Sequence, residues 1–295
     1  MINSAAIRNL FAAPFLIWAV LFIFCPVVAI AWYGLTDAQG AMTLANISLM
    51  THWEYLKALE LSIVLALIST VICLIVAYPL CLILTEKKRG KGSLLFLLFI
   101  LPMWMNSLLT TMAWQTILEK NGILNQFLRL LSLPDVSLIN TPAAIVIGMI
   151  YNFLPYMVLP LYVALSKING NVIAAARDLG ASSWQTFTKV ILPLSLPGAI
   201  SGITMVFIPS LTTFFISGLL GGNKILLIGN IVEQEFTMAY DWHLGSGLSL
   251  VLMVFIVINM LRPEIHDKSL MPALQSAWFV PHVTVYIFSY SLFGC

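Results

Sequence analysis

The chain has 295 residues, 60% of them hydrophobic and only 9% charged, and its mean hydropathy is +0.98. A soluble domain carries about 25% charged residues, so the composition excludes that class and predicts an integral membrane protein. The formal net charge of +2 is too small to indicate nucleic-acid binding.

Six apolar runs approach or exceed the length needed to cross a bilayer, which is about 20 residues. None alternates with a period of two, so we expect an all-α fold with six transmembrane helices and no barrel. The first run contains Pro14 and Pro26 and has no clear A-x-A cleavage site, so we interpret it as a retained span and not as a signal peptide. The runs lie at about 10–33, 59–84, 93–118, 142–165, 199–219 and 244–261.

Lysine and arginine are divided unequally between the two sets of loops that alternating spans create. Cytoplasmic loops carry the excess of positive charge, so the set that includes the N-terminus is predicted to be cytoplasmic. That set holds Arg8, Lys87, Lys88, Arg89, Lys91, Lys167, Arg177, Lys189, Arg262 and Lys268. The opposite set holds only Lys57, Lys120, Arg129 and Lys224.

The sequence contains no recognisable catalytic constellation. "RGKGS" at 89–93 has Thr85 where a phosphate-binding loop needs its first glycine. The four histidines lack metal-ligand spacing. The spans carry almost none of the ionisable residues that proton-driven pumps use, and we find no inverted repeat of the secondary-transporter kind. We therefore expect no enzyme activity, metal or cofactor in this chain, and energy supplied by another subunit.

The longest polar interruption, at about 169–193, predicts two short helices hinged at one glycine. "NGNVIAAARDLG" offers Asn171 as an N-cap and Gly180 for the left-handed position after a helix. "SSWQTFTKVILP" restarts with Ser182 or Ser183 as a cap and is expected to stop before Pro193. Its apolar face would comprise Trp184, Phe187, Val190 and Ile191. At about ten residues, each helix is too short to cross lipid, so the elbow could contact a soluble partner or lie on lipid headgroups.

The insert resembles the cytoplasmic coupling motif of binding-protein-dependent ABC importers, E-A-A-x3-G-x9-I-x-L-P. Val190 replaces the isoleucine, and Ala174 stands where the motif has glutamate, which would weaken coupling or shift the charge partnership to Arg177 and Asp178. The residues that match at the required spacing are Ala175, Ala176, Gly180, Leu192 and Pro193. The resemblance implies that the elbow is the socket for a cytoplasmic ATPase, whose closure swings the spans between inward-open and outward-open states.

Residues 8–258 resemble, more narrowly, the permeases of spermidine/putrescine importers, specifically the first of their two homologous membrane subunits. The resemblance rests on "LPMWMNSLLTTMAWQTIL", "GMIYNFLPYMVLPLYVAL", "AARDLGASSWQTF", "GGNKILLIGNIVEQEF" and "DWHLGSGLSL". It implies the type I ABC importer permease fold in a bacterial inner membrane. The implied partners are a second homologous permease, a cytoplasmic ATP-binding dimer that holds ATP and magnesium, and an extracytoplasmic polyamine-binding protein. A permease for another small organic substrate is the alternative.

A polyamine carries ammonium groups on an apolar stem, so its path needs aromatic faces with a few acids or carbonyls. Candidates are Trp104, Asn106 and Ser107 in span three, Tyr151, Asn152 and Tyr156 in span four, and Glu233, Glu235, Tyr240, Asp241 and Trp242 in the outer loop before span six. Aromatic residues near helix ends also form interfacial belts, and outer acids are often simply solvated. Gly218 stands where similar polyamine permeases carry an aspartate, which counts against this substrate.

From about residue 260 the pattern changes, and we expect an atypical tail after a permease domain of residues 1–259. "PALQSAWFVPHV" resembles a haem-handling cytochrome c biogenesis protein, in which His282 would match a haem ligand. Residues 282–295 could form at most about 21 Å of helix, too short for a core of about 30 Å. The predicted topology also leaves them in the cytoplasm, so we assign no haem and interpret the tail as a fusion or frameshift. A haem-assembly function is the weakest alternative.

Overall fold

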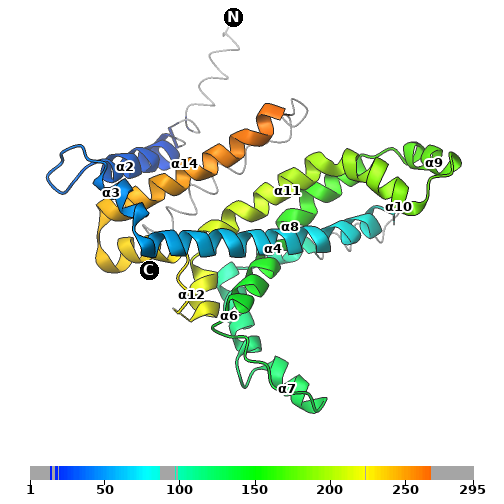
Figure 1. Cartoon of the computed structure of the whole chain (residues 1–295), viewed down its shortest axis with the longest axis horizontal. Coiled ribbons are helices and arrows are strands. Elements are labelled where there is room, and N and C mark those ends of the chain that lie inside the picture. The colour runs from blue at the N-terminus through cyan, green and yellow to red at the C-terminus, as the bar shows by residue number, and fades with distance from the viewer. Residues whose placement is uncertain are drawn as a thin grey trace, which may run out of the picture. The chain divides into compact units, whose positions relative to one another are not determined.

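The structure is a computed structural model that describes residues 14, 17–18, 20–86, 97, 99–222 and 224–266, with side chains up to residue 258. Within these ranges every regular element is a helix, which confirms the predicted all-α class (Figure 1). The elements, with η marking a short 3-10 or π helix, are η1 Val20–Phe24, α2 Cys25–Gly34, α3 Ala45–Ser48, η2 Leu49–Thr51, α4 Trp53–Glu86, η3 Leu101–Trp104, α6 Ser107–Leu118, α7 Ile123–Leu130, α8 Pro142–Ser166, α9 Gly170–Asp178, α10 Ser183–Thr186, η4 Phe187–Ile191, α11 Leu192–Thr212, α12 Phe215–Gly221, α13 Ile228–Gln234, η5 Glu235–Ala239 and α14 Trp242–His266.

The chain divides into two compact units. The larger comprises Lys57–Asn230, and the other combines Met1–Leu56 with Ile231–Cys295. Among the described residues, three helices are long and apolar enough to cross a membrane, namely Trp53–Thr85, Pro142–Ser166 and Ser183–Thr212. Two shorter apolar helices, Val20–Gly34 and Trp242–Ile258, belong to the other unit.

The core of the larger unit forms where α8 and α11 pack together. Gly198 and Gly202, one turn apart in the segment "GAISG", let the two backbones approach closely. A Cβ on Gly198 would lie 2.4 Å from the Cβ of Ala164 and 2.8 Å from the carbonyl oxygen of Pro160. Helices in lipid gain little from hydrophobic association, so small residues that permit backbone contact supply much of the packing.

Helix α4 joins the same core through small and weakly polar side chains. Ser69 Oγ lies 3.4 Å from Met149 Sδ on α8. The hydroxyls of Tyr78 and Ser195 are 2.7 Å apart and connect α4 to α11. The three helices long enough to span a membrane are therefore fastened to one another within this unit.

The third predicted span is interrupted in the structure. η3 ends at Trp104, the next two residues are extended with ψ angles of 149° and 119°, and α6 begins at Ser107. The side-chain oxygen of Asn106 accepts hydrogen bonds from the N–H groups of Leu108 and Leu109, at 2.9 and 3.2 Å. This cap starts a new helix inside a run whose hydropathy predicts a continuous one.

The fifth predicted span is also divided, because α11 ends at Thr212 and α12 begins at Phe215. The buried side chain of Asn230 occupies the break: its Nδ2 donates to the carbonyl of Phe214 at 2.8 Å, and its Oδ1 accepts from the hydroxyl of Ser217. Backbone groups inside a membrane need internal partners, and the Phe214 carbonyl, which also accepts from the N–H of Gly218 at 2.8 Å, gains a second donor from Asn230.

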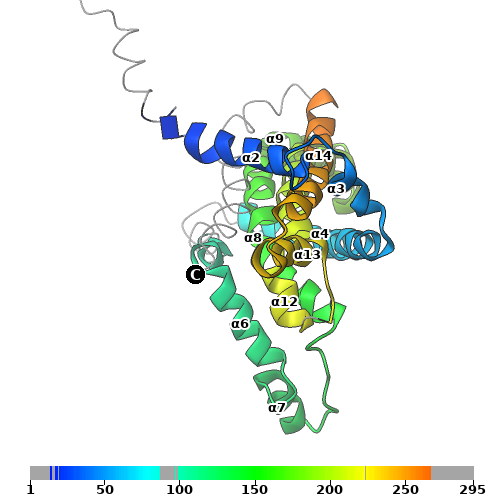
Figure 2. The ribbon, with the colours of Figure 1, turned by 90° about the vertical axis from the view of Figure 1, so that its left-hand side faces the viewer.

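Helices α6 and α7 run across the direction of α4. In Figure 2, α4 is seen nearly end-on, while α6 and α7 lie across the view at full length. The 12 residues of α6 measure about 18 Å, short of a hydrocarbon core of about 30 Å. Within the described residues 99–118, the third predicted run is therefore not one membrane-crossing helix.

The other unit is organised around α2 and α14, which pack against each other. Nδ1 of His243, near the start of α14, lies 2.7 Å from the carbonyl oxygen of Thr36 and 3.0 Å from that of Tyr33. The side-chain amide of Asn46 donates to the same Thr36 carbonyl at 2.9 Å. These bonds fix the end of α2 to a segment about 200 residues later in the chain. Helix α14 continues to His266, and the rest of the predicted tail, including His282, lies outside the described residues.

Candidate functional site

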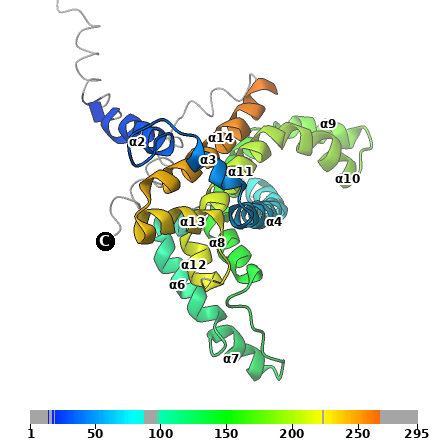
Figure 3. The ribbon, with the colours of Figure 1, turned by 60° about the vertical axis from the view of Figure 1, so that its left-hand side comes forward.

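The elbow predicted at 169–193 is present, and Figure 3 shows α9 and α10 together at one end of α11. Gly180 has a φ of +84°. Its N–H donates to the carbonyl of Arg177 at 2.9 Å, and the N–H of Ala181 donates to the carbonyl of Ala176 at 3.1 Å. This pair of bonds is a Schellman motif, so the predicted hinge glycine is confirmed.

The caps of the elbow confirm one sequence prediction and correct another. Ser182 caps α10 in a capping box, in which its hydroxyl accepts from the N–H of Gln185 at 3.2 Å and its own N–H donates to the Gln185 side chain at 2.9 Å. The N-cap of α9 is Asn169, not the predicted Asn171, whose N–H donates to the Asn169 side chain at 3.0 Å. Either asparagine suits the position by type, and the backbone geometry decides between them.

The sequence predicted that the second helix of the elbow stops before Pro193, and this prediction is wrong. Ser183–Thr212 forms one continuous helix of 30 residues. The π turn η4, Phe187–Ile191, directly precedes the proline region. Proline removes one hydrogen bond of an α-helix and crowds the carbonyl four residues earlier, and a wider π turn accommodates such an irregularity. The second half of the elbow, which begins at Ser183, is therefore a direct extension of membrane helix α11.

The residues of the coupling motif lie mostly on the surface of the elbow. Leu179 is 89% exposed and Trp184 is 71% exposed. Two residues of the predicted apolar face contact each other, because the rings of Trp184 and Phe187 lie 5.8 Å apart, and Phe187 also packs edge-on against Tyr78 of α4 at a ring distance of 5.8 Å. The exposed motif residues are Ala174, Ala175, Arg177, Asp178, Gly180 and Pro193, and the half-buried ones are Ala176, Val190 and Leu192. The elbow thus presents apolar and charged groups beyond the end of α11.

In the larger unit, the structure groups several predicted path residues around α6 and α8. Asn152 donates from Nδ2 to the carbonyl of Gly148 at 2.9 Å and to the hydroxyl of Thr111 at 3.4 Å. The ring of Tyr151 lies 5.3 Å from that of Trp114, in an edge contact. Sequence reasoning missed Thr111 and Trp114, although both lie in the quoted segment around span three.

The remaining predicted residues of this group differ in what their side chains do. Trp104 is 76% exposed, and the side-chain oxygen of Asn106 is engaged in capping α6. Ser107, at the first position of α6, is half-buried. Tyr156 is half-buried, with its ring 6.3 Å from that of Phe153. The structure therefore gives Asn106 a clear structural role.

In the other unit, the predicted acids and aromatics lie around the start of α14. Asp241 accepts from the N–H of Leu244 at 2.9 Å and caps this helix. The ring of Trp242 lies 5.5 Å from that of Phe236 and 6.4 Å from that of Tyr33. Tyr240, with a φ of +55°, is 73% exposed. The sequence offered no signal that Tyr33 belongs to this group, because Tyr33 lies about 200 residues before Trp242 in the chain.

One predicted carboxylate in this unit, Glu235, has a raised pKa. Partial burial raises the pKa of Glu235, and the negative charge of Asp241 raises it further. The nearby side chain of Glu233 accepts from the hydroxyl of Thr237 at 3.3 Å. This part of the unit is thus an aromatic surface that carries acids, and among the described residues no group of three His, Cys, Asp or Glu could hold a metal ion.

Comparison with known proteins identifies the family. A sequence profile described as "Binding-protein-dependent transport system inner membrane component" matches residues 77–267. The chain belongs to this family. It is therefore a multi-pass inner-membrane subunit of a transport system, and not an enzyme.

Several characterised members of this family cover most of the chain. The spermidine/putrescine transport system permease protein PotB of Salmonella typhimurium is 35% identical over 269 residues, which is 88% of this chain and 94% of the relative. PotB of Escherichia coli is 36% identical, covering 83% and 92%. The E. coli inner membrane ABC transporter permease protein YdcU is 27% identical, covering 82% and 84%.

The fold matches chains of ABC transporters whose structures have been solved. A chain of a bacterial ABC transporter involved in the import of alginate has a TM-score of 0.74 at 16% identity, covering 89% of this chain and 96% of that one. A second structure, with an alginate-bound periplasmic protein, gives a TM-score of 0.73 at 16% identity. The predicted ABC importer permease fold is confirmed by these matches.

Proposed function

We propose that this permease forms half of the translocation path of an ATP-driven polyamine importer, with spermidine or putrescine as substrate. The observation that carries the proposal is the 35–36% identity to PotB proteins over nearly their whole length. Identity at that level to the same named permease in several bacteria, against 27% to YdcU, favours a polyamine over another small organic substrate.

The surface chemistry supports a substrate that carries ammonium groups. Cations bind over aromatic faces and beside carboxylates, and the start of α14 combines Trp242 and Phe236 with Glu235 and Asp241. In the larger unit, Tyr151 and Asn152 offer an aromatic ring and an amide on one turn of α8. We assign both groups to the path.

The elbow is the proposed connection to the ATPase. Exposed Leu179 and Trp184, in the same elbow as Arg177 and Asp178, suit contact with a protein. The continuity of Ser183–Thr212 would transmit a displacement of the elbow directly into a membrane helix. ATP and magnesium would be held by this partner ATPase dimer. The N-terminus and the elbow of the permease would lie on the cytoplasmic side of the membrane. A second homologous permease and an extracytoplasmic polyamine-binding protein would complete the importer.

Uptake measurements test the substrate. The chain is expressed with the other subunits of its transporter in a bacterium that lacks its own polyamine import. The entry of radiolabelled spermidine and putrescine into the cells is then measured. We expect energy-dependent uptake that excess unlabelled polyamine abolishes and excess amino acid or sugar does not. Assembly without polyamine uptake would reject the substrate, and Gly218 would then mark the change of specificity.

A substitution pair tests the ATPase connection. Leu179→Asp places a charge on a side chain that is 89% exposed, and Met42→Asp does the same at a control position, in the other unit, that is 77% exposed. We expect only Leu179→Asp to lose co-purification with the ATPase subunits. Equal co-purification of both variants would favour the alternative in which the elbow lies on lipid headgroups.

A further inference from the structure

The segment between α6 and α8 contains a short amphipathic helix to which the proposed function assigns no role. Helix α7, Ile123–Leu130, carries Ile123, Phe127 and Leu130 on one side, three and four residues apart, and Gln126 and Arg129 on another. Residues with this spacing share a helix face.

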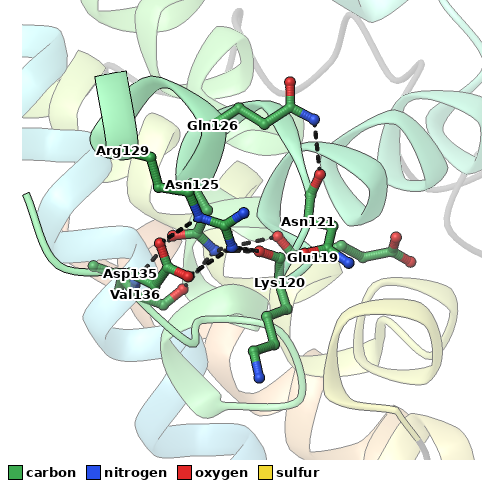
Figure 4. Close-up of polar contacts among 8 residues, drawn as sticks. All are labelled: Glu119, Lys120, Asn121, Asn125, Gln126, Arg129, Asp135 and Val136. Carbon is green, nitrogen blue, oxygen red and sulfur yellow. Dashed lines mark hydrogen bonds and ion pairs between the residues drawn. The ribbon is translucent and has the colours of Figure 1, made fainter. Parts of the chain in front are cut away.

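A buried asparagine fastens this helix to its own loop. Asn125 is fully buried, and its Nδ2 donates to the carbonyls of Glu119, Lys120 and Val136 at 3.3, 3.2 and 3.0 Å. Its Oδ1 accepts from the N–H of Val136 at 2.8 Å. Figure 4 shows these bonds closing the loop around one amide. The orientation of α7 relative to the residues on either side of it is therefore fixed.

The charged groups of the loop neutralise each other. Arg129 donates from its Nε and from one terminal nitrogen to the two carboxylate oxygens of Asp135, at 2.8 and 2.6 Å (Figure 4). These hydrogen bonds hold the pKa of Asp135 below its usual range. The pair remains open to solvent, with side chains 48% and 37% exposed. The polar side of α7 is thus arranged for contact with water.

The apolar side chains of α7 are more exposed than the Arg129–Asp135 pair. Ile123 is 63% exposed, Phe127 58% and Leu130 80%, and Leu131 and Leu133 continue the surface at 53% and 50%. In Figures 1 and 2, α7 extends beyond α6, away from α8 and α11. Large apolar side chains gathered in this way mark a contact site.

We propose that α7 lies in the surface of the lipid bilayer, with Ile123, Phe127 and Leu130 inserted at the boundary between headgroups and acyl chains. Only Glu119–Gly122 separate α7 from α6, a stretch that spans at most about 14 Å, so α7 stays close to the membrane-embedded bundle. Its axis runs across that of α4 (Figure 2), as a helix in the membrane plane requires.

The division of the helix surface favours lipid over a protein partner. An interfacial helix buries one apolar face in the boundary region and keeps a charged face in water, and α7 has an apolar face and a polar face of this kind. A soluble binding protein docks transiently and would leave these side chains in water between dockings, whereas lipid is always present.

Spin labels at three positions test the insertion. Cys25, Cys73, Cys81 and Cys295 are replaced by alanine, and single cysteines are introduced as Phe127→Cys, Leu130→Cys and the control Gln126→Cys. The transporter is reconstituted in nanodiscs of phosphatidylethanolamine and phosphatidylglycerol. We expect labels at 127 and 130 to be accessible to oxygen but several-fold less accessible than the label at 126 to a water-soluble nickel chelate, at a depth of about 5–10 Å.

Two results would overturn the proposal. Equal accessibility of all three labels to the nickel chelate would place α7 in water, and labels at 127 and 130 shielded from both reagents would show that another protein subunit covers them. The unmodified transporter provides a second measurement that does not depend on the variants. A carbene precursor in the lipid acyl chain should label the peptide that contains residues 123–131, and absence of that adduct beside labelled α4 peptides would also contradict lipid contact.

Discussion

Asn230 donates a hydrogen bond from Nδ2 to the carbonyl of Phe214 at 2.8 Å, across the break between α11 and α12. Its Oδ1 also accepts from the N–H of Leu227 at 3.2 Å. One buried amide therefore connects the start of α12 to the loop before α13. These bonds fasten α13 to the helix that follows the break.

Asn230→Ala should destabilise the chain strongly. It removes these bonds together and takes from the N–H of the buried Leu227 the acceptor that Asn230 supplies, and loss of a buried network of this kind costs about 2–4 kcal/mol of unfolding free energy. Denaturant unfolding in detergent measures the change. Gln126→Ala is the control, because Gln126 is exposed and donates only one side-chain bond, to the Asn121 carbonyl at 3.0 Å. Similar effects of the two substitutions would show that Asn230 does not hold the break.

Two glycines near this break should respond in opposite ways to alanine. A Cβ on Gly229 would lie 2.6 and 2.8 Å from the carbonyl oxygens of Thr212 and Thr213, so the backbone must move. A Cβ on Gly218 meets only Asn230 Nδ2, at 3.6 Å. We expect Gly229→Ala to lower the unfolding free energy by about 2 kcal/mol or more, and Gly218→Ala to be neutral or stabilising by up to about 1 kcal/mol.

The room beside Gly218 also permits a functional test. Gly218→Asp would introduce the carboxylate that the sequence resemblance implies at this position, and Gly218→Asn is the uncharged control of the same size. We expect Gly218→Asp alone to lower the KM for spermidine uptake several-fold. An unchanged KM in both variants would place this position outside the substrate path.

The sequence predicted the helical class, the long spans near 59–84 and 142–165 in outline and the hinge of the elbow, because each depends on local signals. Gly180 and Ser182 are recognisable by residue type and spacing alone. The breaks inside the third and fifth predicted spans were not predictable, since hydropathy averages over a cap such as Asn106. The partner that holds the second break, Asn230, lies 16 residues from Phe214. Contacts such as Tyr33 with Trp242 are invisible to any local pattern.

The hinge glycine of the elbow should be sensitive to a single methyl group. Gly180 has a φ of +84° and open space around it, so Gly180→Ala adds backbone strain but no clash. A left-handed non-glycine residue costs about 1–2 kcal/mol. Gly170→Ala is the matched control, because Gly170 lies in the same elbow, also has open space around it, and has an ordinary φ.

We expect Gly180→Ala to reduce substrate-stimulated ATP hydrolysis by the reconstituted transporter several-fold, and Gly170→Ala to leave it unchanged. Gly180→Asn should retain more activity than Gly180→Ala, because asparagine tolerates the left-handed region better. Equal ATPase rates in all of these variants would show that coupling does not depend on the left-handed conformation at residue 180.

Asp241 combines a structural and a proposed substrate role that substitution can separate. Asparagine keeps the oxygen that accepts from the Leu244 N–H but removes the charge, and alanine removes both. Helix capping alone predicts a loss of about 1 kcal/mol of unfolding free energy in Asp241→Ala and almost none in Asp241→Asn. Contact with an ammonium group predicts that both raise the KM for spermidine, by about threefold to fivefold, since an exposed ion pair contributes up to about 1 kcal/mol.

The pH dependence of the same variants supplies an independent readout. Burial is the larger cause that raises the pKa of Glu235 in the folded chain, and the negative charge of Asp241 is the second. The native state therefore gains stability as the pH falls through that raised pKa. Asp241→Asn removes the second cause and leaves the first, so the pKa of Glu235 should move toward its usual value and the gain in stability on acidification should shrink. Unfolding measured above and below this pH range detects the change. A KM for spermidine that stays at the wild-type value in Asp241→Asn, together with the smaller acid stabilisation, would leave Asp241 as a helix cap that interacts with Glu235 and would remove it from the substrate path.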